Sequence, residues 1–260
     1  MSRLEHPWRL FLVVAAMGMG LTSAPALAHD PAHVDLQGVW MAFATVPSGR
    51  LGALSPELTQ AGKDAVQKFM DENGGKDMPE AGWYCVGTGM PYIMTNLASY
   101  PIEIVQKPGE LYMMSELEQQ LRRVFLDGRQ VPENYPRTRT GYSIGHWEGD
   151  TLVVETSNFK DWPLGSAPRS ESAKITERFT LTTKDKVSAK PTAFTSTIPA
   201  LNDKVLIDHL TIEDSQYYAK PLEVDVYYQT VSDKDTLEYD CTVDLWQRAI
   251  EDVKASEKKN

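Results

Sequence analysis

The sequence has two cysteines among its 260 residues, and after residue 28 it has no apolar run long enough to cross a membrane as a helix. It also lacks a stripe of lysine and arginine interleaved with aromatic residues, so we do not expect nucleic acid as a partner. No phosphate-loop pattern occurs, and no dinucleotide fingerprint opens a helix, so no nucleotide cofactor is predicted. The spacing of the histidines and cysteines does not indicate a metal site.

The first 28 residues have the three parts of a secretory signal peptide. A basic region, an apolar region and a small-residue cleavage site follow one another, at residues 1–9, 10–21 and 26–28. We therefore expect a periplasmic or secreted protein that begins near His29, with residues 29–260 forming one domain. Its net charge, formally −10 for the whole chain, suits a soluble protein and does not identify a ligand.

Cys85 and Cys241 lie far apart in the sequence. An even cysteine count in an exported chain predicts a disulfide, which would stabilise the fold by about 2–4 kcal/mol. Two unpaired buried thiols are the alternative, because spacing alone cannot establish the geometry of a bond.

Residues 141–145 read Gly-Tyr-Ser-Ile-Gly, the pattern of a serine hydrolase nucleophile elbow. An elbow needs an apolar strand before it and a helix after it. Here a polar segment, 136–140, precedes it, and a turn (147–150) and a β-rich run (151–156) follow. The pattern therefore predicts a β-hairpin in which Ser143 is a strand residue and not a nucleophile.

The chain from residue 102 onward is nearly all strand. Short runs with alternating apolar residues are bounded by Gly, Pro, Asn or Asp, which is typical of a barrel or a sandwich. A helix is expected from about Ser55 to Asn73, and a short helix from about 244 to 256. Between them, residues 78–101 form a long connection of the kind that is functional or covers an opening. The strands are predicted at 36–44, 102–106, 111–116, 121–126, 141–147, 151–156, 174–182, 193–198, 205–212, 222–230 and 236–243.

Four segments together resemble a family of exported proteins of Proteobacteria and Acidobacteria: 35–40, 122–129, 145–155 and 177–179. The most specific is the Trp-Glu-Gly-Asp-Thr-Leu-Val-Val run that starts at Trp147. The resemblance implies a mainly β fold, a single antiparallel lipocalin-like β-barrel, and associates the chain with cofactor-independent cleavage of lignin-derived aromatic acids. One departure is that the family often has His-Pro after Asp-Gly-Arg, where this chain has Val131-Pro132.

Polar residues in register with the apolar face of a barrel strand are candidates for chemistry. Glu177 shares a strand face with Ile175 and Phe179, and His209 shares one with Val205 and Ile207. We predict that both point into the barrel, where a buried carboxyl has a raised pKa and can act as a general acid or base. Tyr142 and His146 share a face with Ile144, and Tyr228 shares one with Val224 and Val226, so these three are also expected to point inward. The candidate catalytic residues are Glu177, His209 and His146. Structural histidines, and an internal pair between Glu177 and an arginine, are the alternatives.

Arg122 and Arg123 alternate along one predicted strand, so one of them faces inward. An inward arginine needs a carboxylate, from the protein or from a ligand. The candidate ligand-binding residues are Arg123 and Arg129 for the carboxylate of an acid and Tyr142 and Tyr228 for its ring.

Two functions remain open. The first is a cofactor-free lyase of decarboxylase, ring-opening or isomerase type that acts on a small aromatic or hydrophobic acid. The second is a binding protein with the same pocket and no chemistry, which needs only shape, apolar area and a few orienting polar groups.

Overall fold

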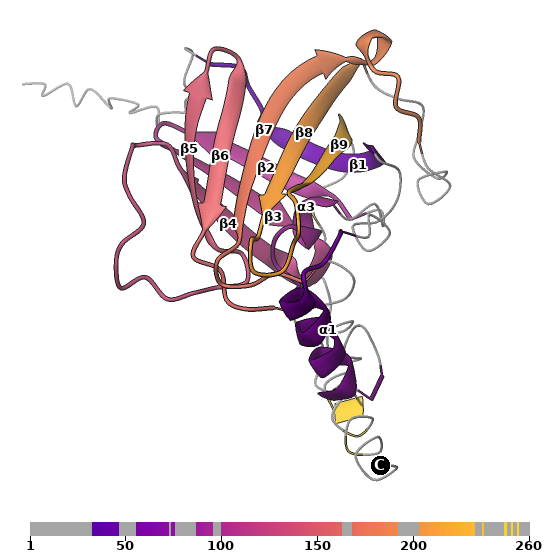
Figure 1. The fold of residues 1–260 in the computed structure, drawn as a ribbon. Coiled ribbons are helices and arrows are strands. Elements are labelled where there is room, and N and C mark those ends of the chain that lie inside the picture. The colour runs from indigo at the N-terminus through magenta and orange to yellow at the C-terminus, as the bar shows by residue number, and fades with distance from the viewer. Residues whose placement is uncertain are drawn as a thin grey trace, which may run out of the picture.

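The fold is a closed β-barrel. A computed structural model describes residues 33–46, 56–72, 74–75, 87–95, 100–162, 168–191 and 203–231, with residues 236, 247–248, 251 and 254 in addition. In these ranges nine strands form the wall in sequence order (Figure 1). They are β1 (Gly38–Val46), β2 (Ile102–Lys107), β3 (Glu110–Ser115), β4 (Gln120–Phe125), β5 (Tyr142–Glu148), β6 (Thr151–Ser157), β7 (Lys174–Thr183), β8 (Lys204–Glu213) and β9 (Leu222–Thr230).

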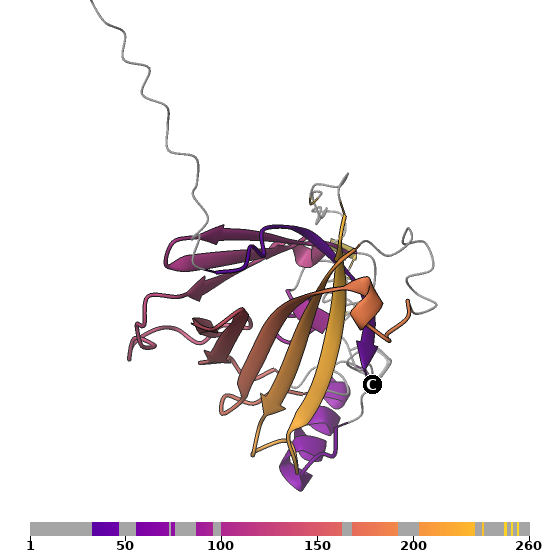
Figure 2. The ribbon, with the colours of Figure 1, turned by 90° about the horizontal axis from the view of Figure 1, so that it is seen from above.

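The predicted mainly β barrel is confirmed, with one departure from an antiparallel wall. β4 and β5 pair in parallel, through Val124 with Ser143 and Phe125 with Ile144. They can do so because residues 126–141 carry the chain back along the barrel before β5 begins. All other neighbouring strands are antiparallel, and β1 pairs with β9 to close the wall, as the view from above also shows (Figure 2).

The predicted hairpin at 141–156 is confirmed as β5 and β6, which pair from Tyr142 with Ser157 to Glu148 with Thr151. Some other expectations fall outside the described residues and stay predictions. These are the signal peptide at 1–28, the strand at 193–198, nearly all of the strand at 236–243, most of the helix at 244–256, and the disulfide between Cys85 and Cys241.

The first helix, α1 (Gln60–Glu72), begins later than the sequence predicts. Leu58 forms a β-bridge with Tyr218, and the Thr59 N–H donates to the carbonyl of Tyr217 at 2.9 Å. This extended pairing prevents a helix from starting at Pro56. The Thr59 hydroxyl instead accepts the N–H of Gly62 at 3.1 Å and so caps the helix.

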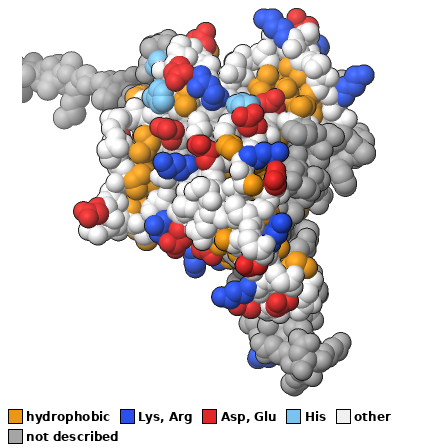
Figure 3. All heavy atoms as spheres, in the orientation of Figure 1, with side chains coloured by type: hydrophobic (Ala, Val, Ile, Leu, Met, Phe, Trp, Pro, Cys, Tyr) orange, Lys and Arg blue, Asp and Glu red, His pale blue; other side chains and the backbone are white. Residues whose placement is uncertain are grey.

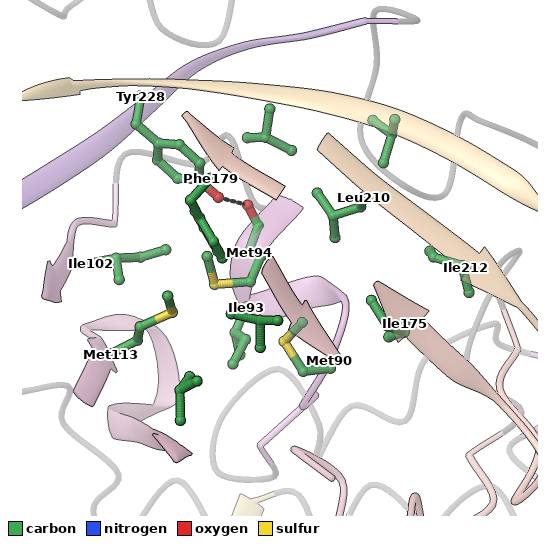
Figure 4. Close-up of a cluster of buried hydrophobic side chains, with 14 of the residues drawn as sticks. Met90, Ile93, Met94, Ile102, Met113, Ile175, Phe179, Leu210, Ile212 and Tyr228 are labelled. Carbon is green, nitrogen blue, oxygen red and sulfur yellow. Dashed lines mark hydrogen bonds between the residues drawn. The ribbon is translucent and has the colours of Figure 1, made fainter. Parts of the chain in front are cut away.

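The interior of the barrel is filled in part by a segment from the predicted connection at 78–101. Residues 87–95 include the short helix α3 (Tyr92–Thr95), and three of their apolar side chains, Met90, Ile93 and Met94, are buried. Figure 4 shows them surrounded by side chains of the wall, among them Ile102, Met113, Ile175, Phe179, Leu210, Ile212 and Tyr228.

Gly89 allows this segment to enter. Its φ is +71°, and a Cβ there would lie 2.3 Å from the carbonyl oxygen of Arg139. The close approach of the two backbones allows a hydrogen bond, in which the Met90 N–H donates to the same Arg139 carbonyl at 3.1 Å. A side chain at position 89 would therefore be strained and would push the segment away from residue 139.

Candidate functional site

Six successive strands each turn one buried polar side chain into the barrel. We call this set the polar belt, and no member is more than 2% exposed. Because inward positions of a small barrel are ordinarily apolar, a ring of polar groups from β4 to β9 is the feature that a functional interpretation must address. The polar belt consists of Arg122, Ser143, Thr156, Glu177, Asp208 and Tyr228.

Arg122 and Glu177 form the centre of the polar belt. The Arg122 Nη1 donates to Glu177 Oε1 at 2.8 Å, and Nη2 donates to Oε2. The rest of the guanidinium is also satisfied, since Nε donates to Ser143 Oγ at 3.0 Å and Nη2 to Thr156 Oγ1 at 2.8 Å. A forked, fully hydrogen-bonded pair of this kind is the arrangement in which a buried arginine can be tolerated.

The prediction that Glu177 points into the barrel is confirmed. Its partner is Arg122, so the alternative of an internal arginine–glutamate pair describes its surroundings. The paired carboxylate has both oxygens engaged, and it is therefore not a free base in this arrangement.

Asp208 differs from the other members of the polar belt because its side chain has no hydrogen bond to any described residue. It is fully buried, and neither carboxyl oxygen has a partner in the part of the chain that the structure describes. Burial raises the pKa of Asp208 well above its usual value, and the neighbouring charge of Glu177 raises this pKa further, while Arg122 lowers it. The shift extends the neutral, protonated form to higher pH, and this form can both donate and accept a hydrogen bond.

Tyr228 connects the polar belt to α3. Its hydroxyl donates to the backbone carbonyl of Met94, as the dashed line in Figure 4 shows. Burial raises the pKa of Tyr228 well above its usual range, and the charges of Asp208 and Glu177 act in the same direction. The prediction that Tyr228 faces inward is confirmed.

The apolar part of the interior is rich in methionine. Met90 and Met94 come from the inserted segment, and Met113 comes from β3, with its sulfur 3.8 Å from Arg122 Nη1. Methionine side chains are unbranched and adapt to irregular shapes, so this packing can rearrange more easily than one built from branched residues.

The prediction that His209 points inward is wrong. Leu206, Asp208 and Leu210 take the inward positions of β8, and the His209 side chain is 41% exposed, with Nδ1 2.6 Å from Asp225 Oδ1. Both faces of β8 carry apolar residues, because Val205 packs on the outside against Phe43. Alternation alone therefore could not tell the inner face from the outer one.

His146 also lies on the outer face, contrary to the prediction. Its side chain is 54% exposed and lies 3.2 Å from Glu148 Oε1. The inward residue of this part of β5 is Ser143, whose small side chain leaves room for the guanidinium of Arg122. Tyr142, which precedes Ser143 in β5, lies on the outer face and is buried there by the rings of Phe125 and Tyr135.

Three of the predicted ligand-binding residues do come together, but outside the barrel. Arg123 and Arg129 place their guanidinium carbons 4.5 Å and 4.0 Å from the ring centre of Phe125, and Tyr142 stacks on the same ring at 5.0 Å. Each arginine pairs with an acid on the outer surface, Arg123 with Glu110 and Arg129 with Asp127. This placement contradicts an inward role for these three residues. Arg122 is the inward arginine of its strand.

The outer surface mixes acidic and basic side chains on the face drawn in Figure 3. Among the residues that the structure describes, no three His, Cys, Asp or Glu side chains are placed to hold a metal ion. No described helix is both long enough and apolar enough to cross a membrane.

The geometry therefore defines a closed barrel with a polar belt and a methionine-rich interior. No protein-family model matches the sequence, and no curated protein is significantly similar to it. Among solved structures, the chain is similar to a mutant of the fluorescent protein UnaG. The TM-score is 0.34 at 10% identity, and the alignment covers 76% of this chain and 97% of that chain.

Proposed function

We propose that the barrel binds a small, largely apolar molecule in its interior and uses the Asp208 carboxyl to orient it. The observation that carries this proposal is the fully buried carboxyl of Asp208, whose two oxygens have no hydrogen-bond partner among the described residues. A buried polar group without a hydrogen bond costs about 1–3 kcal/mol of stability. A ligand atom that completes the hydrogen bonds of Asp208 would recover part of this cost on binding.

The protonation state of Asp208 selects the chemistry of the contact. A neutral carboxyl in an apolar interior can form hydrogen bonds with a hydroxyl, a carbonyl or a phenol of the ligand. The neighbouring Arg122 is already paired with Glu177. The methionine side chains of α3 and β3 would adapt to the apolar body of such a ligand. Entry would require residues 87–95 to move, because Met90, Ile93 and Met94 now fill this space.

Two features of the sequence extend the proposal. The resemblance to exported proteins associated with lignin-derived aromatic acids favours a small aromatic compound as the ligand. The pattern of residues 1–28 favours export and cleavage near His29. N-terminal sequencing of the protein recovered from the periplasm would test the second point, and a start at Met1 would contradict it.

Cofactor-free catalysis is the second candidate, and a specific observation favours it. Two buried carboxyls in different surroundings, one paired with arginine and one with its pKa raised well above the usual value, form the arrangement that assigns acid and base roles in several enzymes. Asp208 would donate the proton and then recover it from water. Of the residues predicted as catalytic, only Glu177 belongs to the polar belt.

The test uses two variants of Asp208 and a panel of lignin-derived phenols and aromatic acids, without added cofactor or metal. We expect Asp208→Leu to raise the melting temperature and to weaken binding about tenfold or more, because it removes both the unpaired group and the ligand contact. Asp208→Asn keeps a donor and an acceptor, so binding should be weakened less. His209→Gln, on the outer face, is the control.

Unchanged ligand affinity in Asp208→Leu would contradict the proposal. Product analysis in the same incubations separates the two candidates, because a binding protein returns each compound unchanged. Turnover that is lost in Asp208→Asn would favour the enzyme.

A further inference from the structure

A second group of buried polar atoms that have no hydrogen-bond partner among the described residues lies at the end of the barrel where β5 begins and where α1 packs. Trp162 belongs to this end, since Phe69 of α1 contacts its ring edge-on at 6.3 Å. Trp162 and Arg169 form a β-bridge with backbone hydrogen bonds of 2.7 Å and 2.9 Å. Arg139 lies above the Trp162 ring, with its guanidinium carbon 4.3 Å from the ring centre.

The unpartnered atoms at this end are all hydrogen-bond donors. Arg169 is 2% exposed, and its Nε and Nη2 have no hydrogen-bond partner among the described residues. The same holds for Nε of Arg139 and for the indole Nε1 of Trp162. A buried guanidinium without an acceptor is costly, so this arrangement differs from that of Arg122, which has every partner it needs.

The acidic side chains near these arginines accept hydrogen bonds from other residues. Asp214 accepts the N–H and the hydroxyl of Ser170, both at 2.6 Å, and Asp161 accepts the Tyr217 hydroxyl at 2.8 Å. Glu118 accepts the N–H of Thr88 at 2.6 Å. These acids influence the arginines through their charge but do not supply the missing acceptors. Burial lowers the pKa of Arg169 to about 10, which still leaves it charged at neutral pH.

An aromatic ring lies against each of the two guanidinium groups. Phe159 lies under Arg169, with 4.5 Å between the guanidinium carbon and the ring centre, as Trp162 lies under Arg139. Stacking on aromatic rings holds the guanidinium planes while their N–H groups remain available to an acceptor. Arg139 is only partly buried, so this side of the group reaches the surface.

From these contacts we propose that Arg139, Arg169 and Trp162 form a binding site for a small organic carboxylate. A carboxylate offers two oxygens in one plane, which is the geometry that arginine N–H groups recognise best. Its charge would offset two cations that repel each other and that form no ion pair with an acid in the part of the chain that the structure describes. The site is separate from Asp208, and it stands whether or not the barrel interior takes a ligand.

The experiment is isothermal titration of the full mature chain with benzoate, in a buffer without phosphate. We expect Arg139→Gln and Arg169→Gln each to weaken benzoate binding about tenfold or more, since each removes charged hydrogen bonds. Arg137→Gln is the matched control, because Arg137 belongs to the same segment, is exposed and pairs with Glu171. Asp208→Asn should bind benzoate at this site as the wild type does, which separates the result from the proposed function.

Folding does not obscure the outcome. Arg169→Gln removes a buried charge whose Nε and Nη2 have no hydrogen-bond partner among the described residues, so the melting temperature should not fall. The partly buried Arg139 provides a second variant. The proposal is overturned if benzoate gives no binding, or if both variants bind it as tightly as Arg137→Gln does. Inorganic phosphate that binds more tightly than benzoate would overturn the assignment to a carboxylate.

Discussion

Asp208 and His209 are adjacent in the sequence and lie on opposite sides of the barrel wall. Asp208 is fully buried in the interior, whereas His209 is on the outer surface within 2.6 Å of Asp225. Of the two, only Asp208 has no hydrogen-bond partner among the described residues. The chemistry of this part of β8 therefore depends on which of two neighbouring residues faces inward.

Asp208 should make stability depend on pH in an unusual direction. Its pKa is raised on folding, whereas an unfolded aspartate has a pKa of about 3.9. Its contribution to stability is therefore complete below about pH 4 and is lost as the pH rises toward the folded pKa. We therefore expect the free energy of unfolding of the wild type, minus that of Asp208→Asn, to fall as the pH rises above about 4, at up to about 1.4 kcal/mol per pH unit.

Asp127 provides the control with the opposite sign. Arg129 lowers the pKa of Asp127 to about 2, so its contribution to stability is present above about pH 4 and is lost as the pH falls toward 2. Urea unfolding of the wild type, Asp208→Asn and Asp127→Asn across this range would measure both differences. A difference for Asp208→Asn that stays flat with pH would show that Asp208 is not protonated in the folded protein.

Glu177→Gln should lower stability strongly, because it leaves the charge of Arg122 buried without its counterpart. Breaking a buried pair of this kind costs about 3–5 kcal/mol. The double variant Arg122→Met with Glu177→Leu removes both charges and should recover most of this loss. If Glu177→Gln unfolds like the wild type and loses about 10²-fold or more of an activity, Glu177 is a catalytic acid or base and not only a structural partner.

Much of the barrel wall could be predicted from the sequence because strands have a short period and clear boundaries. The strand at 222–230 has the predicted bounds, and the hairpin of β5 and β6 differs by a residue or so at each end. The parallel pairing of β4 with β5 could not be predicted, since it depends on how residues 126–141 return along the barrel. No local pattern in that polar segment specifies its path.

The inner face of each strand was harder to predict than the strand itself. On β7 one face is clearly more apolar, so Glu177 was placed correctly. On β8 and β5 the outer face is also covered, by Phe43 over Val205 and by Tyr135 over Tyr142, so alternation gave two equally apolar faces. Asp208 was missed for this reason, although it separates Leu206 from Leu210 on the inner face.

Ser143→Ala should lower the stability of the fold, and it should not change the reaction of the protein with serine-directed reagents. The Ser143 hydroxyl accepts the Arg122 Nε at 3.0 Å and lies 2.9 Å from the Thr156 hydroxyl, so its loss leaves a buried donor unpaired at a cost of about 1–3 kcal/mol. A serine-directed fluorophosphonate should label neither the wild type nor the variant. Labelling of the wild type that disappears in Ser143→Ala would show that the serine is a nucleophile after all.

The two cysteines should be bonded in the exported protein. The export that residues 1–28 predict would favour a disulfide between Cys85 and Cys241, and the sequence has no other cysteine to compete for either one. Mass spectrometry after alkylation without reduction should find no modified cysteine in protein recovered from the periplasm, and two in the reduced sample. Two alkylated cysteines without reduction would contradict the prediction.

Tyr228→Phe should loosen the segment that fills the barrel. The Tyr228 hydroxyl donates to the carbonyl of Met94, and phenylalanine keeps the ring but leaves this buried carbonyl without its donor. The cost of about 1–3 kcal/mol would fall on α3, which is held inside the barrel mainly by apolar contacts. Hydrogen exchange should therefore become faster at Ile93, Met94 and Thr95, whose N–H groups are bonded within the segment, and stay unchanged in β6 and β7. Equal acceleration throughout the barrel would instead mean that Tyr228 supports the whole fold and does not control the opening of α3 in particular.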